Sequence, residues 1–362
     1  MSRDPKAPIR VLVVDDSSLM RRLLSDGLAA DPMFDVVATA ADAYEARDLI
    51  VSKRPQVMTL DVEMPRMNGV DFLRRLMPQY PLPVVMVSGL TTAGGDLALA
   101  SLAAGAVDVV LKAQADRPGD MARMLDELRT KVRIAATANV SAWKRAMIPA
   151  HNGGAGNKMV APPSPSIIAI GASTGGTDAT RRVLAHLPLD VPGVVVVQHM
   201  PAGFTSMYAD RLNQELRLRV VEAHDGEPIL GGTVYVAPGE LQCAVVRAGD
   251  HFAIRVRPGP KVSGHAPSVD VLFASVAASV GRAAVGVLLT GMGRDGADGL
   301  LEMRRAGART LSQDEATSVV YGMPREAWQQ GASERQVGID DMAAEIVARL
   351  PRRQRATSER VA

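Results

Sequence analysis

Short apolar runs alternate with longer amphipathic segments along most of the chain. Five such runs occur in its first third, and valine, isoleucine and leucine dominate them. Runs of this kind, each followed by a helix-length segment, are typical of strands buried on both faces of a parallel sheet. The candidate strands are IRVLVVD (9–15), DVVATA (35–40), VMTLDV (57–62), PVVMVS (83–88) and AVDVVLK (106–112). The pattern predicts a doubly wound parallel α/β domain over residues 9–127.

The same alternation resumes at residue 166 and ends near residue 350. It predicts a second doubly wound α/β domain over 166–350. Alternating residues around RAGDH, between Val234 and Val256, predict an antiparallel hairpin on the sheet. The candidate strands are IIAIGA (167–172), GVVVVQH (193–199), RLRVVEA (217–223), GTVYVAP (232–238), AVGVLLT (284–290) and ARTLSQ (308–313).

One predicted helix of the second domain has a continuous apolar face. The segment SVDVLFASVAASV places Val269, Leu272, Phe273, Val276 and Val280 at helical spacing. We expect this face to pack in the core.

A different composition separates the two domains. Residues 128–165 contain NGGAGNK and then APPSPS, which predicts a linker that is flexible at first and stiffer later. The last residues, 351–362, form a basic tail. A length of 362 residues also favours two domains over one.

Composition narrows the class of protein. With 47% hydrophobic and 22% charged residues and a net charge of +2, the chain is typical of a soluble protein without a nucleic-acid-binding surface. It lacks a signal peptide and an apolar run of about 18 residues, so we expect a cytoplasmic protein without membrane insertion. The single cysteine, Cys243, permits no internal disulfide and lies in a strand-like run, where we expect it to be buried.

Acidic and other polar residues end the predicted strands of the first domain. Asp15 and Asp16 follow the first strand, and Asp61, Ser88 and Lys112 end three others. The carboxyl ends of parallel strands share one edge of a sheet, so these side chains should converge. Acidic residues after strands are also common turn formers and caps. Five suitable residues at these strand ends nevertheless favour a site.

The chemistry of that predicted site is phosphoryl transfer. Carboxylates of Asp15, Asp16 and Asp61 suit Mg²⁺, a hard cation that takes carboxylate and phosphate oxygens. Lys112 and Ser88 would contact phosphoryl oxygens, and Asp61 would be the nucleophile that forms an acyl phosphate.

These residues, with the segment DVEMPRMNG, resemble the receiver domain of two-component response regulators over residues 9–127. The resemblance implies a flavodoxin-like fold and magnesium-dependent phosphorylation at Asp61 by a histidine kinase. Two positions depart from the family. Val109 replaces the usual aromatic residue of the switch, and Ala113 replaces the proline after Lys112, so we expect no cis bond there.

The second domain begins with a glycine-rich turn around a serine. GASTG (171–175) fits the G-x-S-x-G nucleophile elbow between a strand and a helix, which would place Ser173 at the sheet edge beside a helix N-terminus. The same glycines would also suit a loop that wraps a phosphate. A nucleophilic serine requires a base and an acid as well.

Candidates for the base and the acid also lie at strand ends. His199 ends the four-valine strand, and Asp295 follows VGVLLTGMGRDG. His186 belongs to a predicted helix, His251 to the hairpin and His151 to the linker. Position alone does not exclude the remaining two histidines, His224 and His265.

A competing interpretation is a nucleotide-dependent enzyme. GMGRDG matches G-x-G-x-x-G after a strand, with Asp314 roughly 20 residues further on. However, dinucleotide folds carry that motif after their first strand, and the charge of Asp295 would oppose a pyrophosphate.

Four segments resemble the catalytic domain of chemotaxis protein-glutamate methylesterases, the CheB family. They are IGASTGGTDA, VVVVQHMPAGFTSMYADRLN, APSVDVLFASVA and LLTGMGRDGADGL. The resemblance covers 166–350 and implies Ser173 as nucleophile, His199 as base and Asp295 as acid. It also implies a backbone contribution of Met292 to the oxyanion site.

The resemblance further implies a phosphorylation-regulated serine hydrolase, without a cofactor of its own. It would demethylate glutamate methyl esters and deamidate glutamines on the cytoplasmic domains of methyl-accepting chemoreceptors, and we expect a monomer. Gly264 and Ala266 stand where many relatives carry arginines, which would alter substrate affinity. The alternative from another class is a response regulator whose C-terminal domain only binds partners, which an intact Ser/His/Asp set disfavours.

Overall fold

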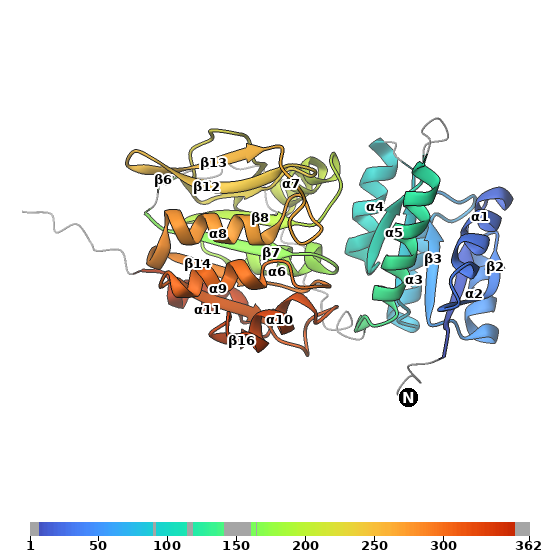
Figure 1. Ribbon diagram of the computed structural model, residues 1–362. Coiled ribbons are helices and arrows are strands. Elements are labelled where there is room, and N and C mark those ends of the chain that lie inside the picture. The colour runs from blue at the N-terminus through green and yellow to red at the C-terminus, as the bar shows by residue number, and fades with distance from the viewer. Residues whose placement is uncertain (1–6, 90–91, 114–118, 141–160, 164, 352–362) are drawn as a thin grey trace, which may run out of the picture.

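The computed structural model describes residues 7–89, 92–113, 119–140, 161–163 and 165–351. Two α/β domains lie side by side, and helices α4 and α5 of the N-terminal domain face the C-terminal domain (Figure 1). Most of the expected linker and all but the first residue of the expected basic tail lie outside the described residues.

The N-terminal domain contains a five-stranded parallel sheet in the order β2-β1-β3-β4-β5. Two of its three inner strands, β3 and β4, are buried at every residue, as the continuous apolar runs predict. The strands are β1 (Ile9–Val14), β2 (Phe34–Ala40), β3 (Val57–Asp61), β4 (Val84–Ser88) and β5 (Asp108–Leu111). The predicted doubly wound domain is confirmed.

Four helices connect these strands, and a fifth, α5, follows the last strand. Polar side chains cap three of them: Ser17 accepts a hydrogen bond from the first turn of α1, Asp42 from that of α2 and Asn68 from that of α3. The helices are α1 (Ser18–Ala29), α2 (Ala43–Lys53), α3 (Gly69–Gln79), α4 (Thr92–Ala104) and α5 (Asp120–Ala135). Helix α5 runs past residue 127, where we expected the linker to begin, because Leu128 and Val132 continue its buried face.

The C-terminal domain contains a seven-stranded parallel sheet in the order β16-β15-β14-β7-β8-β11-β9. The strands are β7 (Ile167–Ala172), β8 (Gly193–Gln198), β9 (Arg219–Glu222), β11 (Thr233–Val236), β14 (Ala284–Leu288), β15 (Arg309–Gln313) and β16 (Arg335–Val337). The chain leaves β7 for β8 on one side and later returns to β14 on the other. The crevice at such a reversal of strand order is where α/β proteins bind ligands.

The apolar face predicted for the segment 268–280 lies in the core as α8. Val269, Leu272, Phe273 and Val276 are fully buried, and Val280 packs beside them at the helix end. The helices of this domain are α6 (Gly176–His186), α7 (Phe204–Glu215), α8 (Val269–Ser279), α9 (Ala297–Arg305), α10 (Met323–Gln329) and α11 (Met342–Arg349), with a 3-10 turn at Gly281–Ala283.

The predicted hairpin is present, but its extent was wrong. It consists of β12 (Gln242–Ala248) and β13 (His251–Arg257), whereas Val234 belongs to the parallel strand β11. The hairpin forms a separate two-stranded sheet that packs on α8. Cys243 of β12 is fully buried as expected, and burial raises the pKa of its thiol to about 12.

A short strand lies inside the expected linker. Strand β6 (Ala161–Pro163) pairs with β10 (Leu230–Gly231) of the C-terminal domain. Among the described residues, no helix combines the length and the apolar character that a membrane span requires.

Candidate active site

Ser173 lies directly after β7, at the point where the strand order reverses. Its N–H donates to the Thr290 carbonyl oxygen (3.0 Å), and α6 begins three residues later. The left-handed residue of this turn is Gly175 (φ 77°), where an added Cβ would lie 2.6 Å from the Cβ of Val319. The turn therefore needs a glycine after the serine, and it places Ser173 at the rim of the sheet.

His199 follows the neighbouring parallel strand β8 and so reaches the same rim. Its N–H donates to the Ala172 carbonyl oxygen (3.1 Å), and the side-chain amide of Gln198 donates to the Ser173 carbonyl oxygen (2.9 Å). These bonds tie the ends of the two strands together. The serine and the histidine, distant in sequence, line one pocket.

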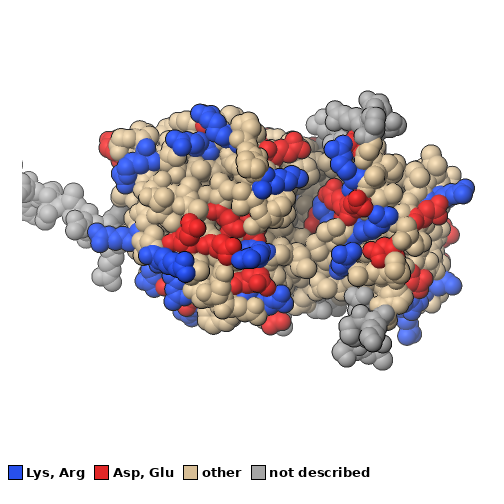
Figure 2. Space-filling view, viewed as in Figure 1, with Lys and Arg blue, Asp and Glu red and all other residues tan. Residues whose placement is uncertain are grey.

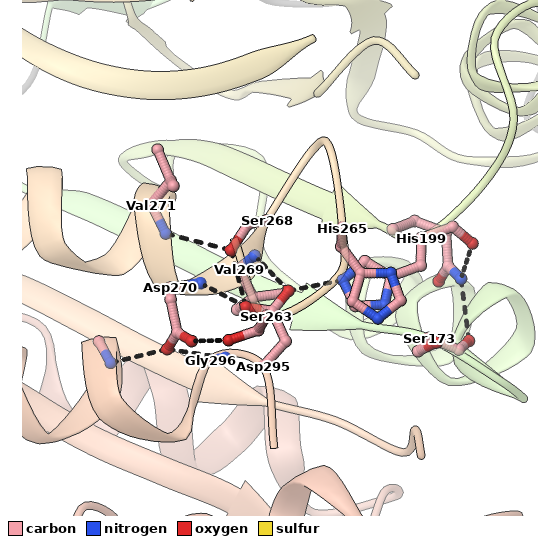
Figure 3. Close-up of polar contacts among 12 residues, drawn as sticks. Ser173, His199, Ser263, His265, Ser268, Val269, Asp270, Val271, Asp295 and Gly296 are labelled. Atoms are coloured by element: carbon pink, nitrogen blue, oxygen red, sulfur yellow. Dashed lines mark hydrogen bonds and ion pairs between the residues drawn. The ribbon is translucent and has the colours of Figure 1, made fainter. Parts of the chain in front are cut away.

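Asp295 lies on the other side of the imidazole (Figure 3). Its Oδ2 is 2.7 Å from Nε2 of His199, and the two side chains are 1% and 8% exposed. Because an ionised carboxylate only accepts, Nε2 carries the proton in neutral His199. Nδ1 is then the basic nitrogen. It is buried and has no hydrogen-bond partner within the described structure.

The N-terminus of α8 holds the Asp295 carboxylate. Oδ1 accepts from the Ser268 hydroxyl (2.7 Å) and the Asp270 N–H (3.0 Å), and Oδ2 also accepts from the Val269 N–H (2.8 Å). Burial raises the pKa of Asp295, but the hydrogen bond and charge of His199, with those α8 donors, outweigh it and lower the pKa to about 2. Asp295 is thus ionised at neutral pH.

Asp270 makes the reciprocal contact. Its Oδ1 accepts from the N–H groups of Gly296 and Gly299 at the start of α9 (both 2.9 Å), and its Oδ2 accepts from the Ser263 hydroxyl (2.9 Å). Asp295 therefore binds the N-terminus of α8, the helix that contains Asp270. Asp270 binds the N-terminus of α9, the helix that follows Asp295. Those α9 donors are the ones that a dinucleotide pyrophosphate would need, so this contact disfavours the nucleotide interpretation of GMGRDG.

The remaining histidines lie in different environments. His186 lies in α6 and bonds the Arg182 carbonyl oxygen through Nδ1, His251 lies in β13, and His224 is largely exposed. His151 lies outside the described residues. His265, by contrast, stacks flat on His199.

The loop after β14 passes beside the serine. A Cβ added at Gly291 would lie 2.7 Å from the Cβ of Ser173, so only glycine permits this approach. Met292 comes next, and its side chain is 47% exposed. Met292 therefore directly follows the glycine that passes beside Ser173.

The polar strand ends of the N-terminal domain also converge. Carboxylate oxygens of Asp15, Asp16 and Asp61 lie within 4.8 Å of one another. Lys112 Nζ lies 2.8 Å from Asp61 Oδ2 and 3.0 Å from Asp15 Oδ2, and Ser88 is fully buried at the end of the neighbouring strand. This donor set fits a hard divalent cation, because it offers several carboxylate oxygens in one place.

Burial and charge act against each other in this acidic pocket. Burial raises the pKa of Asp61 to about 6; the Lys112 hydrogen bond opposes the rise and the Asp15 charge adds to it. Burial lowers the pKa of Lys112, but Asp61 and Asp15 outweigh it and the net shift is upward. Three carboxylates held this close together favour a bound cation.

Comparison with known proteins assigns both domains. Residues 168–346 match the model of the CheB methylesterase family, and residues 11–125 match that of the response regulator receiver domain. A protein-glutamate methylesterase/protein-glutamine glutaminase of Syntrophotalea carbinolica is 55% identical over 347 residues, which cover 95% of this chain and 98% of the relative. The chain belongs to the CheB methylesterase family.

Two further likenesses agree with this membership. A protein-glutamate methylesterase/protein-glutamine glutaminase of Escherichia coli is 48% identical over 345 residues, 94% of this chain and 97% of its own. The crystal structure of the Thermotoga maritima CheB methylesterase catalytic domain superposes with a TM-score of 0.50 at 32% identity. The superposed residues cover 51% of this chain and 98% of that domain.

In this member of the CheB family the receiver domain lies against the serine site. One pocket is lined by Val107, Asp108 and Lys131 of the receiver and by Ser173, Thr174 and His199 of the catalytic domain. The Asn139 N–H donates to the Val319 carbonyl oxygen (2.8 Å), and α4 packs on α6 and α7. Figure 2 shows the furrow where the domains meet, with acidic and basic side chains mixed on both.

Several residues at the site were not predicted as functional. Ser268 precedes an apolar helical segment, which is an N-cap signal, but nothing in the sequence connects it with Asp295. No local sequence pattern marks Asp108, Thr174 or Asp270 as part of the site, because their hydrogen-bond partners lie in distant segments. The departures Gly264 and Ala266 flank His265 in the loop beside His199.

Proposed function

We propose that Ser173, His199 and Asp295 form the catalytic triad of a receiver-regulated protein-glutamate methylesterase and protein-glutamine glutaminase of chemotaxis. The observation that carries the assignment is the buried Asp295–His199 contact at 2.7 Å, beside a serine on the same rim. Relatives with this activity in their names match the chain over almost its whole length.

Catalysis begins with the serine and the free nitrogen of the histidine. Ser173 Oγ attacks the carbonyl carbon of a γ-glutamyl methyl ester while Nδ1 of His199 takes its proton. The tetrahedral oxyanion collapses, the C–O bond to the methoxy group breaks, and the imidazolium gives its proton to the departing methanol. Asp295 stays ionised throughout and stabilises the imidazolium.

Water completes the cycle. His199 takes a proton from water as its oxygen attacks the acyl-serine, and the serine leaves with that proton, which releases a glutamate carboxylate. A glutamine side chain follows the same path with ammonia as the leaving group. Each event adds one negative charge to the substrate.

The oxyanion site involves Met292. Its backbone N–H follows Gly291, which passes directly beside Ser173 in the loop after β14. A backbone donor placed there would stabilise the tetrahedral oxyanion.

The receiver domain regulates the esterase through Asp61. Asp61 is the phosphorylation site, and Lys112 and Ser88 contact the phosphoryl oxygens. Asp15, Asp16 and Asp61 would hold Mg²⁺, which neutralises charge on the phosphoryl group. A histidine kinase of the chemotaxis pathway is the phosphodonor. The unphosphorylated receiver covers the serine site, as the shared pocket supports.

The substrates are the cytoplasmic helices of methyl-accepting chemoreceptors, and the protein acts in the cytoplasm as a monomer. The loop that holds Gly264 and Ala266 lies beside the site, where a smaller and uncharged surface would change the affinity for such acidic helices.

The experiment is methanol release from methylated receptor with and without acetyl phosphate. Ser173→Ala and His199→Ala should each lower the rate by at least about 10³-fold, because the triad acts as a unit. Near-native release by either variant would refute the assignment. Labelling of Ser173 by a serine-directed fluorophosphonate distinguishes an esterase from a domain that only binds partners.

A further inference from the structure

The ring of His265 stacks on the ring of His199, the proposed catalytic histidine. The ring centroids of His199 and His265 are 3.6 Å apart and the rings are 9° from parallel (Figure 3). At that distance the two faces are in van der Waals contact over their full area.

The loop that carries His265 is fixed at several points. Val262 and His265 exchange both backbone hydrogen bonds (3.0 and 2.9 Å). The Gln242 side chain donates to the carbonyl oxygens of Pro260 (2.9 Å) and His265 (3.1 Å) and accepts from the Ser268 N–H (2.9 Å). The stack is therefore set by the β13–α8 loop.

The same loop positions the acid. Ser268, three residues after His265, donates its hydroxyl to Asp295 (2.7 Å). Asp295 in turn holds His199 through a single hydrogen bond at Nε2. One hydrogen bond fixes the direction of that nitrogen but leaves the ring free to tilt and twist about it. A flat contact on the ring face removes that freedom.

Charge favours this arrangement as well. Burial lowers the pKa of His265 to about 4 and is the largest cause of this shift. The charges of His199 and Lys261 add to it, and the charge of Asp295 opposes it. His265 is thus neutral at neutral pH. A neutral ring does not repel the imidazolium that forms on His199, and its π face attracts that charge.

We propose that His265 is a positioning residue of the esterase: its ring face holds the His199 imidazole in the plane that aims Nε2 at Asp295 and Nδ1 at Ser173. This inference rests on the proposed function. It assigns to His265 a contact through its ring face and no proton transfer of its own.

The test compares His265→Ala with His265→Phe in the full-length protein. Alanine removes the stack, and phenylalanine keeps a flat ring that cannot titrate. We expect His265→Ala to lower kcat for methanol release and the rate of fluorophosphonate labelling of Ser173 by roughly 10- to 100-fold. KM should change by less than about threefold. His265→Phe should recover both rates to within about threefold of the wild type.

Val262→Ala is the matched control. Val262 is partly exposed in the same loop and pairs with His265 only through its backbone. We expect this variant to be labelled at the wild-type rate and to unfold at the wild-type temperature. Unfolding temperatures of the two His265 variants close to the wild type show that the loss is not one of folding.

Two results would overturn the inference. One is labelling of His265→Ala at the wild-type rate. The other is a His265→Phe variant as slow as His265→Ala, which would mean that a ring nitrogen matters and the ring face does not. Failure of the proposed function has a separate signature: the wild type would release no methanol, or Ser173→Ala would still be labelled.

Discussion

The Thr174 hydroxyl donates a hydrogen bond to Oδ2 of Asp108 across the domain interface, at 3.0 Å. Thr174 directly follows the serine and is 6% exposed, and Asp108 begins the last strand of the receiver sheet. The other Asp108 oxygen, Oδ1, lies 3.0 Å from Lys131 Nζ, which also pairs with Glu127. The receiver thus binds Thr174, the neighbour of Ser173, through a carboxylate that also pairs with Lys131.

Loss of this contact should weaken the hold of the receiver on the serine site. A hydrogen bond to a charged group contributes about 1.5 to 3 kcal/mol when buried, and water recovers part of it once the domains separate. We expect Asp108→Ala to raise methanol release by the unphosphorylated protein roughly 3- to 10-fold. The rate with saturating acetyl phosphate should not change, because the substitution leaves the proposed triad of Ser173, His199 and Asp295 intact.

Two control variants test whether the expected rise comes from loss of this hydrogen bond. Asp108→Asn keeps an acceptor for Thr174 and should raise the basal rate less than Asp108→Ala does. Asp35→Ala removes an exposed carboxylate from β2 of the same domain and should have no effect. A basal rate in Asp108→Ala equal to that of the wild type would show that this hydrogen bond does not restrain the receiver.

Asp295→Asn should nearly abolish catalysis. An amide at this position keeps one acceptor oxygen but presents an NH₂ group to the donors of Ser268, Val269 and His199 that now meet the carboxylate. His199 would lose both its orientation and the charge that stabilises the imidazolium. We expect kcat for methanol release to fall roughly 10³- to 10⁴-fold.

The comparison for this variant is Asp298→Asn. Asp298 lies in the first turn of α9, pairs with Arg294 at the surface and does not contact the triad. It should keep the wild-type rate. An Asp295→Asn enzyme within tenfold of the wild type would remove Asp295 from the triad.

The sequence predicts what depends on local pattern. Apolar runs located the buried parallel strands to within two residues at either end, and the strand ends placed Ser173 and His199 on one rim, because parallel neighbours share an edge. The edge strand β16 was missed, since its three residues include only one that is buried. The hairpin was extended wrongly to Val234, because alternation does not distinguish a half-buried hairpin from a short buried strand.

What the sequence does not predict depends on contacts between distant segments. The hold of Ser268 on Asp295 joins two helix starts that are 27 positions apart, and the hydrogen bond of Thr174 to Asp108 spans 66 positions and two domains. His265 illustrates the limit best. Its position in a polar loop left its role open, and only the fold brings its ring onto His199.

Asp61 should be required for the response to a phosphodonor. With acetyl phosphate and Mg²⁺, the wild type should release methanol several-fold faster, and EDTA should remove that rise because the three carboxylates that converge at Asp61 bind phosphate poorly without a cation. Asp61→Asn should show no rise. Asp35→Asn, in the same domain, should respond as the wild type does. A rise that persists in Asp61→Asn would place the phosphorylation site elsewhere.

Asp270 should make stability depend on pH between about 4 and 6. Burial is the main reason that its pKa is raised from 3.8 to about 6, and the charge of Asp295 adds to it against the hydrogen bonds of Gly299 and Ser263. The folded state therefore binds this proton more tightly than the unfolded chain does. The contribution of Asp270 to stability is greatest below pH 4 and declines as pH rises through 6.

Asp270→Asn tests this directly. Asparagine keeps an acceptor oxygen for the N–H groups of Gly296 and Gly299 but cannot ionise. We expect the unfolding free energy of the variant, relative to the wild type, to increase by roughly 1 to 3 kcal/mol between pH 4 and pH 7. Asp298→Asn, an exposed carboxylate on α9, should show no such trend. A difference between Asp270→Asn and the wild type that stays constant across this range would show that Asp270 titrates as an ordinary carboxylate.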